Sequence, residues 1–338
     1  MRKVLWQTRS VLVADSIRNG KLAPDANGGN AYDFHAATAL SEKFKVDVDE
    51  SALMKSGDSL WKYWRRMSNE NTPADIIIRE PYPIVFGSTK LKTPCVGMIH
   101  HIDDVLGKSS IKHRWYFNRL KRRLPKLDLV ITVSSYWREY LESLGCKNVK
   151  VIHNGFNHSE YVVSETAVQD FRTRHNIPKG KPLIYAGNAT RQKGIYAVYE
   201  ALKDKGYHLL MSGSQNQAAD LNVQYLHMDR KEYISMLHAC DLVITMSRMT
   251  EGWNRIAHEA LLCGTPVIGS GVGGMKELLN GAGQMIVTDE AKLAVAVQEV
   301  LHRSAWYVEN GKKFVLQFDM NYFRKQWTNT ISDLLSRA

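Results

Sequence analysis

The sequence predicts an α/β protein built from two doubly wound parallel sheets. Runs of β-branched and other apolar residues, bounded by polar ones, alternate along the chain with helix-like stretches, which is typical of parallel strands buried on both faces. The heptad Asp128-Leu-Val-Ile-Thr-Val-Ser134 returns as Asp241-Leu-Val-Ile-Thr-Met-Ser247, with one difference, so the two halves are alike. A chain of 338 residues that is 44% hydrophobic is long for one core and suits two.

The strands expected in the first half lie at residues 4–6, 75–78, 95–99, 129–133 and 149–152. Those expected in the second half lie at residues 183–186, 208–211, 223–226, 242–245, 267–269 and 285–287. A turn dipeptide, Asn154-Gly155, and the polar stretch 157–181 separate the two sets, which predicts a domain boundary near residues 155–165.

The charge of the chain indicates an acidic partner. Its formal net charge is +11 and its pI is about 9.3, which suits nucleotide phosphates, an anionic lipid surface or nucleic acid. Two stretches are both basic and aromatic, one at residues 61–66 and the other at residues 112–126. Each is consistent with a membrane-facing surface, or with a solvated helix whose aromatic residues turn into the core.

The compartment expected is the cytoplasm, including a peripheral position at the inner membrane face. Four widely spaced cysteines, Cys95, Cys146, Cys240 and Cys263, form neither a disulfide framework nor a zinc pattern. No apolar run is long enough for a membrane span, and the N-terminus has no export signal.

The most informative stretch runs from Glu251 to Glu259, between the strand expected at 242–245 and a helix expected at 256–262. Open α/β sheets bind ligands at such junctions. Backbone N–H groups of Trp253, Asn254 and Arg255 would there meet a diphosphate. If the segment is helical, the glutamates are about 12 Å apart, which lets one meet a sugar and the other a ribose. Alternatively, Glu251 caps the helix and Glu259 is solvated.

Together with the segment Gly264-Thr-Pro-Val-Ile-Gly269 and the loop Gly271-Val-Gly-Gly-Met-Lys-Glu277, this stretch resembles the retaining GT-B glycosyltransferases of group 1 and family 4. Their pattern is E-G-F-x-x-x-x-x-E-A followed by a G-G-x-x-E turn, and V-I-H-N-G-F-N at residues 151–157 stands where they have V-I-P-N-G-V-D. The resemblance implies two Rossmann-like domains facing across a cleft: an acceptor-side domain at 1–160 and a nucleotide-sugar domain at 161–312. It also implies that the segment 313–338 forms a helix, at 321–337, that returns to the first domain.

The resemblance assigns roles to individual residues. In the loop Gly187–Gly194, Lys193 matches the lysine that holds the leaving phosphates, Asn188 replaces the family's arginine, and Arg191 is available to supply that charge. His100, after the strand at 95–99, would bond the transferred sugar; a structural histidine is the alternative, for His100 or His101. Glu251 would orient the sugar and Glu259 would hold the ribose. Gly29, in Asn27-Gly-Gly-Asn30 before a helix expected at 32–44, would let backbone approach the substrate.

The expected reaction is retaining transfer of a hexosyl group from a UDP- or GDP-sugar to an unknown acceptor hydroxyl on a lipid, glycan or protein. No cofactor is required, and the D-x-D pair Asp47 and Asp49 lies far from every phosphate motif, so no metal role is expected. Three alternatives stay open. One is a nucleotide-sugar epimerase, a second is a basic nucleic-acid binder or transferase, for which no recognition motif is present, and a third is a sugar-binding relative without activity.

Overall fold

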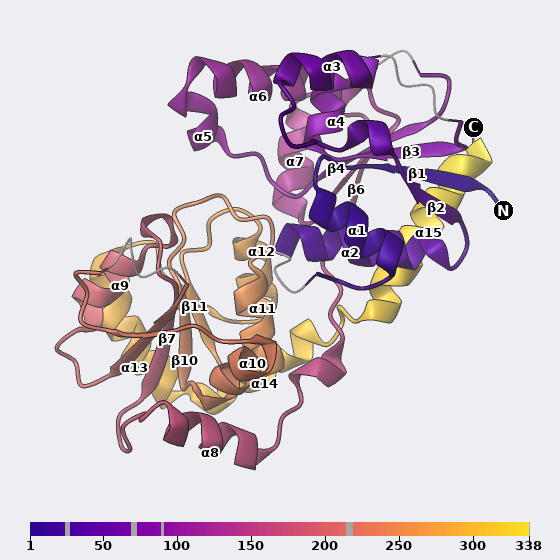
Figure 1. Cartoon of the computed structure of the whole chain (residues 1–338). Coiled ribbons are helices and arrows are strands. Elements are labelled where there is room, and N and C mark those ends of the chain that lie inside the picture. Colours follow the sequence, from indigo (N-terminus) through magenta and orange to yellow (C-terminus); the bar gives the residue numbers. More distant parts are fainter. Residues whose placement is uncertain (24–27, 69–72, 89–90, 214–218, 338) are drawn as a thin grey trace. The chain divides into compact units, whose positions relative to one another are not determined.

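The computed structural model describes residues 1–23, 28–68, 73–88, 91–213 and 219–337. Two compact units make up the chain: Met1–Gly155 with Met320–Ala338, and Phe156–Asp319 (Figure 1). The first change of unit therefore falls directly after the turn dipeptide Asn154-Gly155.

The first unit contains a six-stranded parallel sheet in the order β2-β1-β3-β4-β5-β6. Its strands are β1 (Lys3–Gln7), β2 (Lys45–Val48), β3 (Ile76–Arg79), β4 (Cys95–Ile99), β5 (Leu129–Thr132) and β6 (Val149–Val151). The prediction missed β2, and the reason is physical. An edge strand needs no continuous apolar run, and Lys45-Val-Asp-Val48 alternates charged and apolar residues.

The helices of this unit are α1 (Val11–Asn19), α2 (Gly28–Ser41), α3 (Leu60–Ser68), α4 (Pro81–Phe86), α5 (Asp104–Ser109), α6 (Ile111–Arg123), α7 (Ser135–Ser143) and α15 (Met320–Arg337). The helix expected at 32–44 begins four residues earlier, so Gly28 and Gly29 form its first turn, and Asn27 lies outside the described residues. No described helix of the chain is long and apolar enough to cross a membrane.

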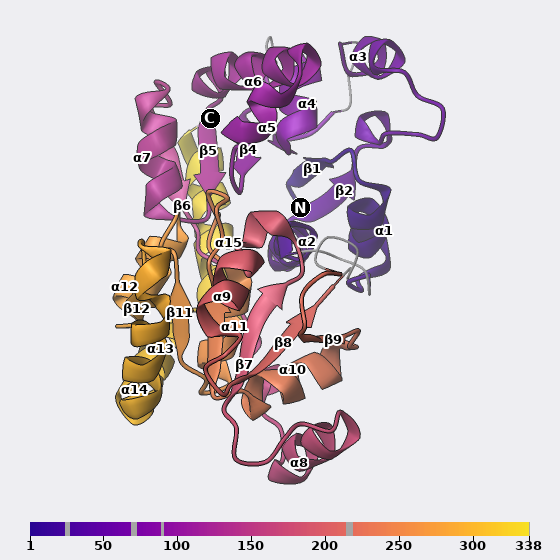
Figure 2. The same ribbon diagram turned by 90° about the vertical axis from the view of Figure 1, so that its left-hand side faces the viewer.

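The C-terminal helix α15 packs on α2 within the first unit (Figures 1 and 2). Tyr32 of α2 meets the rings of Phe323 and Trp327 edge-on, with ring centroids 5.1 and 6.1 Å away. Lys43 also donates to the Ser332 hydroxyl at 2.9 Å. Aromatic contacts of this kind add about 0.5–1.5 kcal/mol each beyond the area they bury.

The second unit contains another six-stranded parallel sheet, in the order β12-β11-β10-β7-β8-β9. Its strands are β7 (Leu183–Asn188), β8 (His208–Ser212), β9 (Gln224–Leu226), β10 (Leu242–Thr245), β11 (Val267–Gly269) and β12 (Met285–Ile286). All six strands expected in this half are present. The predicted fold class, doubly wound parallel sheets in both halves, is confirmed.

The helices of this unit are α8 (Glu165–Arg174), α9 (Ile195–Leu202), α10 (Arg230–Ala239), α11 (Arg255–Leu262), α12 (Met275–Gly281), α13 (Leu293–His302) and α14 (Ser304–Val315). Apolar residues of β7, β8 and β10 form a core with α9 and α13. Ile184, Ile244 and Val297 in this core are fully buried.

Each sheet has a point where the strand order reverses. In the first unit it lies between β1 and β3, and in the second unit between β7 and β10. Helices leave the sheet in opposite directions on the two sides of such a point, so the loops at the carboxyl ends of the strands spread apart and leave room for a ligand. The functional residues are therefore expected just after these four strands.

Candidate functional site

The loops after β7 and β10 meet at the reversal point of the second sheet. The Lys193 ammonium donates to Glu251 Oε1 at 2.6 Å, and both side chains are only partly exposed. The backbone N–H of Arg248 donates to the carbonyl of Gln192 at 2.9 Å, which ties the two loops together. Two residues that the sequence singled out separately thus form one ion pair at the place where an α/β sheet binds ligands.

Two glycines allow this close approach. Gly194, directly after Lys193, has a φ of +73°, and a Cβ there would lie 2.0 Å from the Met246 carbonyl oxygen. Gly273 has a φ of +69°, and a Cβ there would lie 2.5 Å from the carbonyl oxygen of Glu251. Side chains cannot be accommodated at these distances, so glycine is needed at both positions.

The two other residues predicted in the Lys193 loop have contacts of a different kind. Asn188 ends β7, and its amide packs against Gly213, the residue after β8. The exposed Arg191 guanidinium lies over the ring of Tyr196, 4.8 Å from its centroid. The part that either residue takes in binding a phosphate remains a prediction.

The segment from Glu251 to Glu259 is not helical throughout, so the 12 Å estimate does not apply. Helix α11 begins only at Arg255, and the preceding Asn254 has a left-handed φ of 67°. Asn254 Oδ1 accepts from the N–H of Ala257 at 3.0 Å. The Trp253 indole is 2% exposed and donates to His258 Nδ1 at 3.1 Å. In this structure the side chains of Trp253 and Asn254 therefore serve the core and the helix cap.

Glu259 is buried among hydrogen-bond donors. Its Oε1 accepts from the Tyr161 hydroxyl and its Oε2 from the Tyr233 hydroxyl, each at 3.0 Å. The guanidinium groups of Arg230 and Arg255 lie 3.1 and 3.5 Å from Oε1. Burial, with the Glu259 charge second, raises the pKa of Tyr161 and Tyr233, so both phenols stay protonated donors. The alternative of a solvated Glu259 is wrong, because four partners surround this carboxylate.

In the first unit, His100 follows β4 and joins a cluster of two carboxyl groups, those of Asp33 and Glu80. His100 Nε2 lies 2.7 Å from Oδ1 of Asp33, a buried residue of α2. Asp33 is in turn hydrogen-bonded to Glu80, which directly follows β3. Glu80 also accepts from the Thr8 hydroxyl at 2.7 Å, and Thr8 directly follows β1.

This carboxyl pair holds a proton at neutral pH. Burial raises the pKa of Asp33 to about 8, and burial together with the Asp33 charge raises the pKa of Glu80 well above its ordinary value. Two adjacent carboxylates cannot both ionise readily, so the pair titrates as a unit. Asp33 therefore holds His100 Nε2 in a hydrogen bond, and the charge of this partner changes with pH.

Sequence reasoning missed Asp33 and Glu80. Glu80 carries a signal, because it stands at the carboxyl end of a predicted buried strand next to the reversal point. Asp33 carries none, since it is one buried polar residue inside a helix.

The remaining predicted positions are also in the first unit. Gly29 lies in the first turn of α2. Asp47 of β2 lies 3.3 Å from the Lys3 ammonium, and Asp49 accepts from the Gln7 amide and from Ser51. Within the described ranges, no group of three or more His, Cys, Asp or Glu side chains is arranged to hold a metal ion.

Comparison with known proteins places this geometry in a family. Residues 44–160 match the model of Glycosyltransferase Family 4, and residues 168–314 match the model of Glycosyl transferases group 1. A curated relative, an uncharacterized glycosyltransferase of Methanocaldococcus jannaschii, is 27% identical over 248 residues, or 68% of this chain. The aligned part spans 65% of that relative and about half of others.

Solved structures with the same fold are also identified. Sucrose-phosphate synthase from Thermosynechococcus elongatus superposes with a TM-score of 0.78 at 20% identity, over all of both chains. Anabaena HepE in complex with UDP-glucose gives a TM-score of 0.72 at 20% identity, over 98% of this chain and 100% of HepE. Consecutive matches to the two family models thus cover most of the chain, and the chain belongs to the group 1 glycosyltransferases of the GT-B fold.

Proposed function

We propose that the protein is a retaining hexosyltransferase that moves a sugar from a UDP- or GDP-sugar to an acceptor hydroxyl on a lipid, a glycan or a protein, in glycan biosynthesis. The observation that carries this proposal is the Lys193–Glu251 ion pair at the β7/β10 reversal point. The HepE complex with UDP-glucose supports UDP as the nucleotide, because HepE has a similar fold.

The ion pair suggests how the donor would bind. A diphosphate offers Lys193 a partner of higher charge than Glu251 does, so binding would draw the ammonium from carboxylate to phosphate. The released carboxylate would then accept hydrogen bonds from sugar hydroxyls. Lys193 would stabilise the charge that develops on the leaving diphosphate, which is typically worth about 3 to 4 kcal/mol per preorganised donor.

Retention requires that the acceptor attack from the face that the diphosphate leaves. We propose that the departing phosphate takes the acceptor proton, that His100 contacts the transferred sugar, and that Asp33 fixes the orientation of the His100 ring. The hydrogen bond of 2.7 Å between His100 and Asp33 supports the last point. No metal or cofactor is part of this proposal.

The roles of the other predicted residues follow the same reasoning. The backbone of Trp253, Asn254 and Arg255 would contact the diphosphate, and Gly29 would allow close approach of backbone to substrate. Glu259 would hold the ribose only by exchanging one of its present donors for a ribose hydroxyl, since two tyrosines already bond its oxygens. Because Asn188 is uncharged and replaces the family's arginine, Arg191 would supply the second positive charge for the phosphates.

The decisive experiment measures nucleotide release from a panel of UDP- and GDP-sugars, with and without candidate acceptors. The wild-type chain is compared with Lys193→Ala and with Lys205→Ala, a matched control at an exposed lysine of the same unit. The proposal expects turnover of at least one donor by the wild type and the control, and its loss in Lys193→Ala. Absence of even slow hydrolysis of every donor would refute it.

We also propose a cytoplasmic location with peripheral contact to the inner face of a membrane. The basic and aromatic stretches at residues 61–66 and 112–126 of the first unit support this.

A further inference from the structure

Helices α3, α4 and α6 form one aromatic layer in the first unit. Tyr63 of α3 lies 6.3 Å from Tyr82 of α4, and Tyr82 lies 4.9 Å from Tyr116 of α6, measured between ring centroids. Helix α4 contacts both α3 and α6, and the three helices lie together at one end of this unit (Figures 1 and 2). The inward aromatic rings thus hold the two basic helices next to each other.

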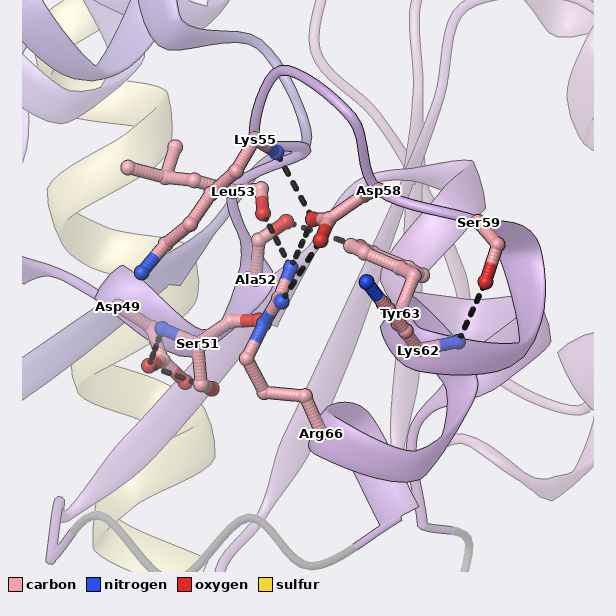
Figure 3. Close-up of polar contacts among 10 residues, drawn as sticks. All are labelled: Asp49, Ser51, Ala52, Leu53, Lys55, Asp58, Ser59, Lys62, Tyr63 and Arg66. Atoms are coloured by element: carbon pink, nitrogen blue, oxygen red, sulfur yellow. Dashed lines mark hydrogen bonds and ion pairs between the residues drawn. The ribbon is translucent and has the colours of Figure 1, made fainter.

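Helix α3 is held by one of its faces only. Arg66 donates to the carbonyls of Ser51 and Leu53 and pairs with Asp58 at 2.8 Å (Figure 3). Tyr63 donates to the carbonyl of Ala52 at 2.9 Å. These contacts fix the helix against the preceding loop and leave its opposite face uncovered.

The uncovered face of α3 is apolar and basic. Trp61 is 61% exposed and Trp64 is 43% exposed, beside the exposed Leu60. The exposed cation Arg65 lies over the Trp61 ring, 5.7 Å from its centroid. Exposed apolar side chains that gather on one face of a helix are typical of an interaction site.

Helix α6 carries a cationic groove of about 410 Å³. Its lining includes one exposed tryptophan and five cations: Arg114, Trp115, Arg119, Arg122, Arg123 and Lys126. Ile111, at its edge, is 78% exposed. The groove therefore pairs apolar surface with a high density of positive charge.

The charges in this groove are not neutralised by carboxylates in the described part of the chain. The Arg119 guanidinium donates to the carbonyl of Val85, and that of Arg123 donates to the carbonyls of Ile84 and Gly87. Carbonyls satisfy the hydrogen bonds but leave both charges in place. Partial burial lowers the pKa of Arg123 to about 10, and the neighbouring charges of Arg119 and Arg79 add to this shift. Residues 111–127 contain no Asp or Glu.

We propose that the outer faces of α3 and α6 form a docking surface for an anionic lipid bilayer, with lipid phosphates in the α6 groove and the tryptophans of both helices at the headgroup level. Charge complementarity selects the anionic partner, and interfacial tryptophans select a bilayer over a soluble polyanion. Both helices expose tryptophan rings beside positive charges, and this combination distinguishes the surface from an ordinary solvated helix face.

The test measures binding of the whole chain to vesicles of phosphatidylglycerol with phosphatidylcholine, and to vesicles of phosphatidylcholine alone. Two variants address the two components: Arg114→Gln with Arg122→Gln, and Trp61→Ser with Trp64→Ser. The matched controls are Lys312→Gln with Lys313→Gln, and Trp306→Ser, all at exposed positions of the other unit. Circular dichroism of each variant verifies that it is folded.

We expect binding to the anionic vesicles only, weakened by salt, and about fivefold weaker per cation removed, so roughly 25-fold for the arginine pair. The tryptophan pair should weaken binding as well, while the controls bind like the wild type. Equal binding to both vesicles, or controls that lose as much as the variants, would overturn the proposal. Tighter binding to duplex DNA than to vesicles, insensitive to the tryptophan changes, would also overturn it and assign the surface to nucleic acid. Vesicle binding needs no sugar transfer, so its failure is distinct from a failure of the proposed reaction.

Discussion

The substitution Lys193→Ala tests whether Lys193 serves catalysis or stability. The Lys193 side chain is one-third exposed and pairs with Glu251, which is less exposed. Solvent screens such a pair, so Lys193→Ala should lower the free energy of unfolding by about 1 kcal/mol or less. If Lys193 stabilises the leaving diphosphate, the same change should lower kcat by about 100- to 1000-fold, which corresponds to about 3 to 4 kcal/mol in the transition state.

The assay for this prediction is nucleotide release under saturating donor, with denaturant unfolding measured on the same samples. Lys205→Ala is the control for loss of a surface lysine from this unit, and it should change neither quantity. The reasoning would be refuted if Lys193→Ala raised KM for the donor and left kcat unchanged, because Lys193 would then bind ground state and transition state equally. A loss of several kcal/mol in stability would also contradict it.

Three further predictions concern stability. Glu259→Gln should lower the free energy of unfolding by about 3 kcal/mol, because it leaves two arginines beside a neutral amide. Urea unfolding measures this change, and an unchanged midpoint would refute the idea that the Glu259 carboxylate stabilises the fold. Folded Asp33 keeps its proton up to about pH 8, whereas unfolded Asp33 releases it near 3.8, so stability should fall as pH rises between these values, by at most about 1.4 kcal/mol per pH unit for this group. Asp33→Asn should flatten that slope, and an equally steep slope in the variant would contradict the raised pKa. Gly194→Ala should lower the free energy of unfolding by more than about 3 kcal/mol, because the new Cβ is strained at a left-handed φ and clashes with the Met246 carbonyl. Gly206→Ala is the control and should cost about 1 kcal/mol, because its φ is +78° but no atom lies within 4 Å. Equal losses of stability in urea unfolding would show that the structure relieves the clash at Gly194.

The sequence predicted the strands that are buried on both faces. Strand β10 could be predicted because a parallel strand covered on both faces needs a continuous apolar run, and Leu242–Thr245 is such a run in a repeated heptad. Strand β2 lies at the sheet edge, where that need disappears, and its only sign in the sequence is a short alternation of charged and apolar residues over Lys45–Val48.

The sequence predicted which loops carry the candidate site, but not which side chains contact one another there. Lys193 and Glu251 were found separately, 58 positions apart, and only the sheet order brings their loops together. The burial of Trp253 and the partners of Glu259 depend on tertiary packing from distant segments such as Phe318 and Tyr161. The Asp33–Glu80 pair could not be predicted, because a single carboxylate inside a helix looks the same whether it faces water or a second carboxylate.

The most direct test of the central claim is a crystal structure with UDP bound. We expect density for the diphosphate within hydrogen-bond distance of the Lys193 ammonium, with the Lys193–Glu251 ion pair lengthened or broken. Nucleotide density elsewhere in the chain, or diphosphate bound while Lys193 still holds Glu251 at its present 2.6 Å and makes no phosphate contact, would contradict it.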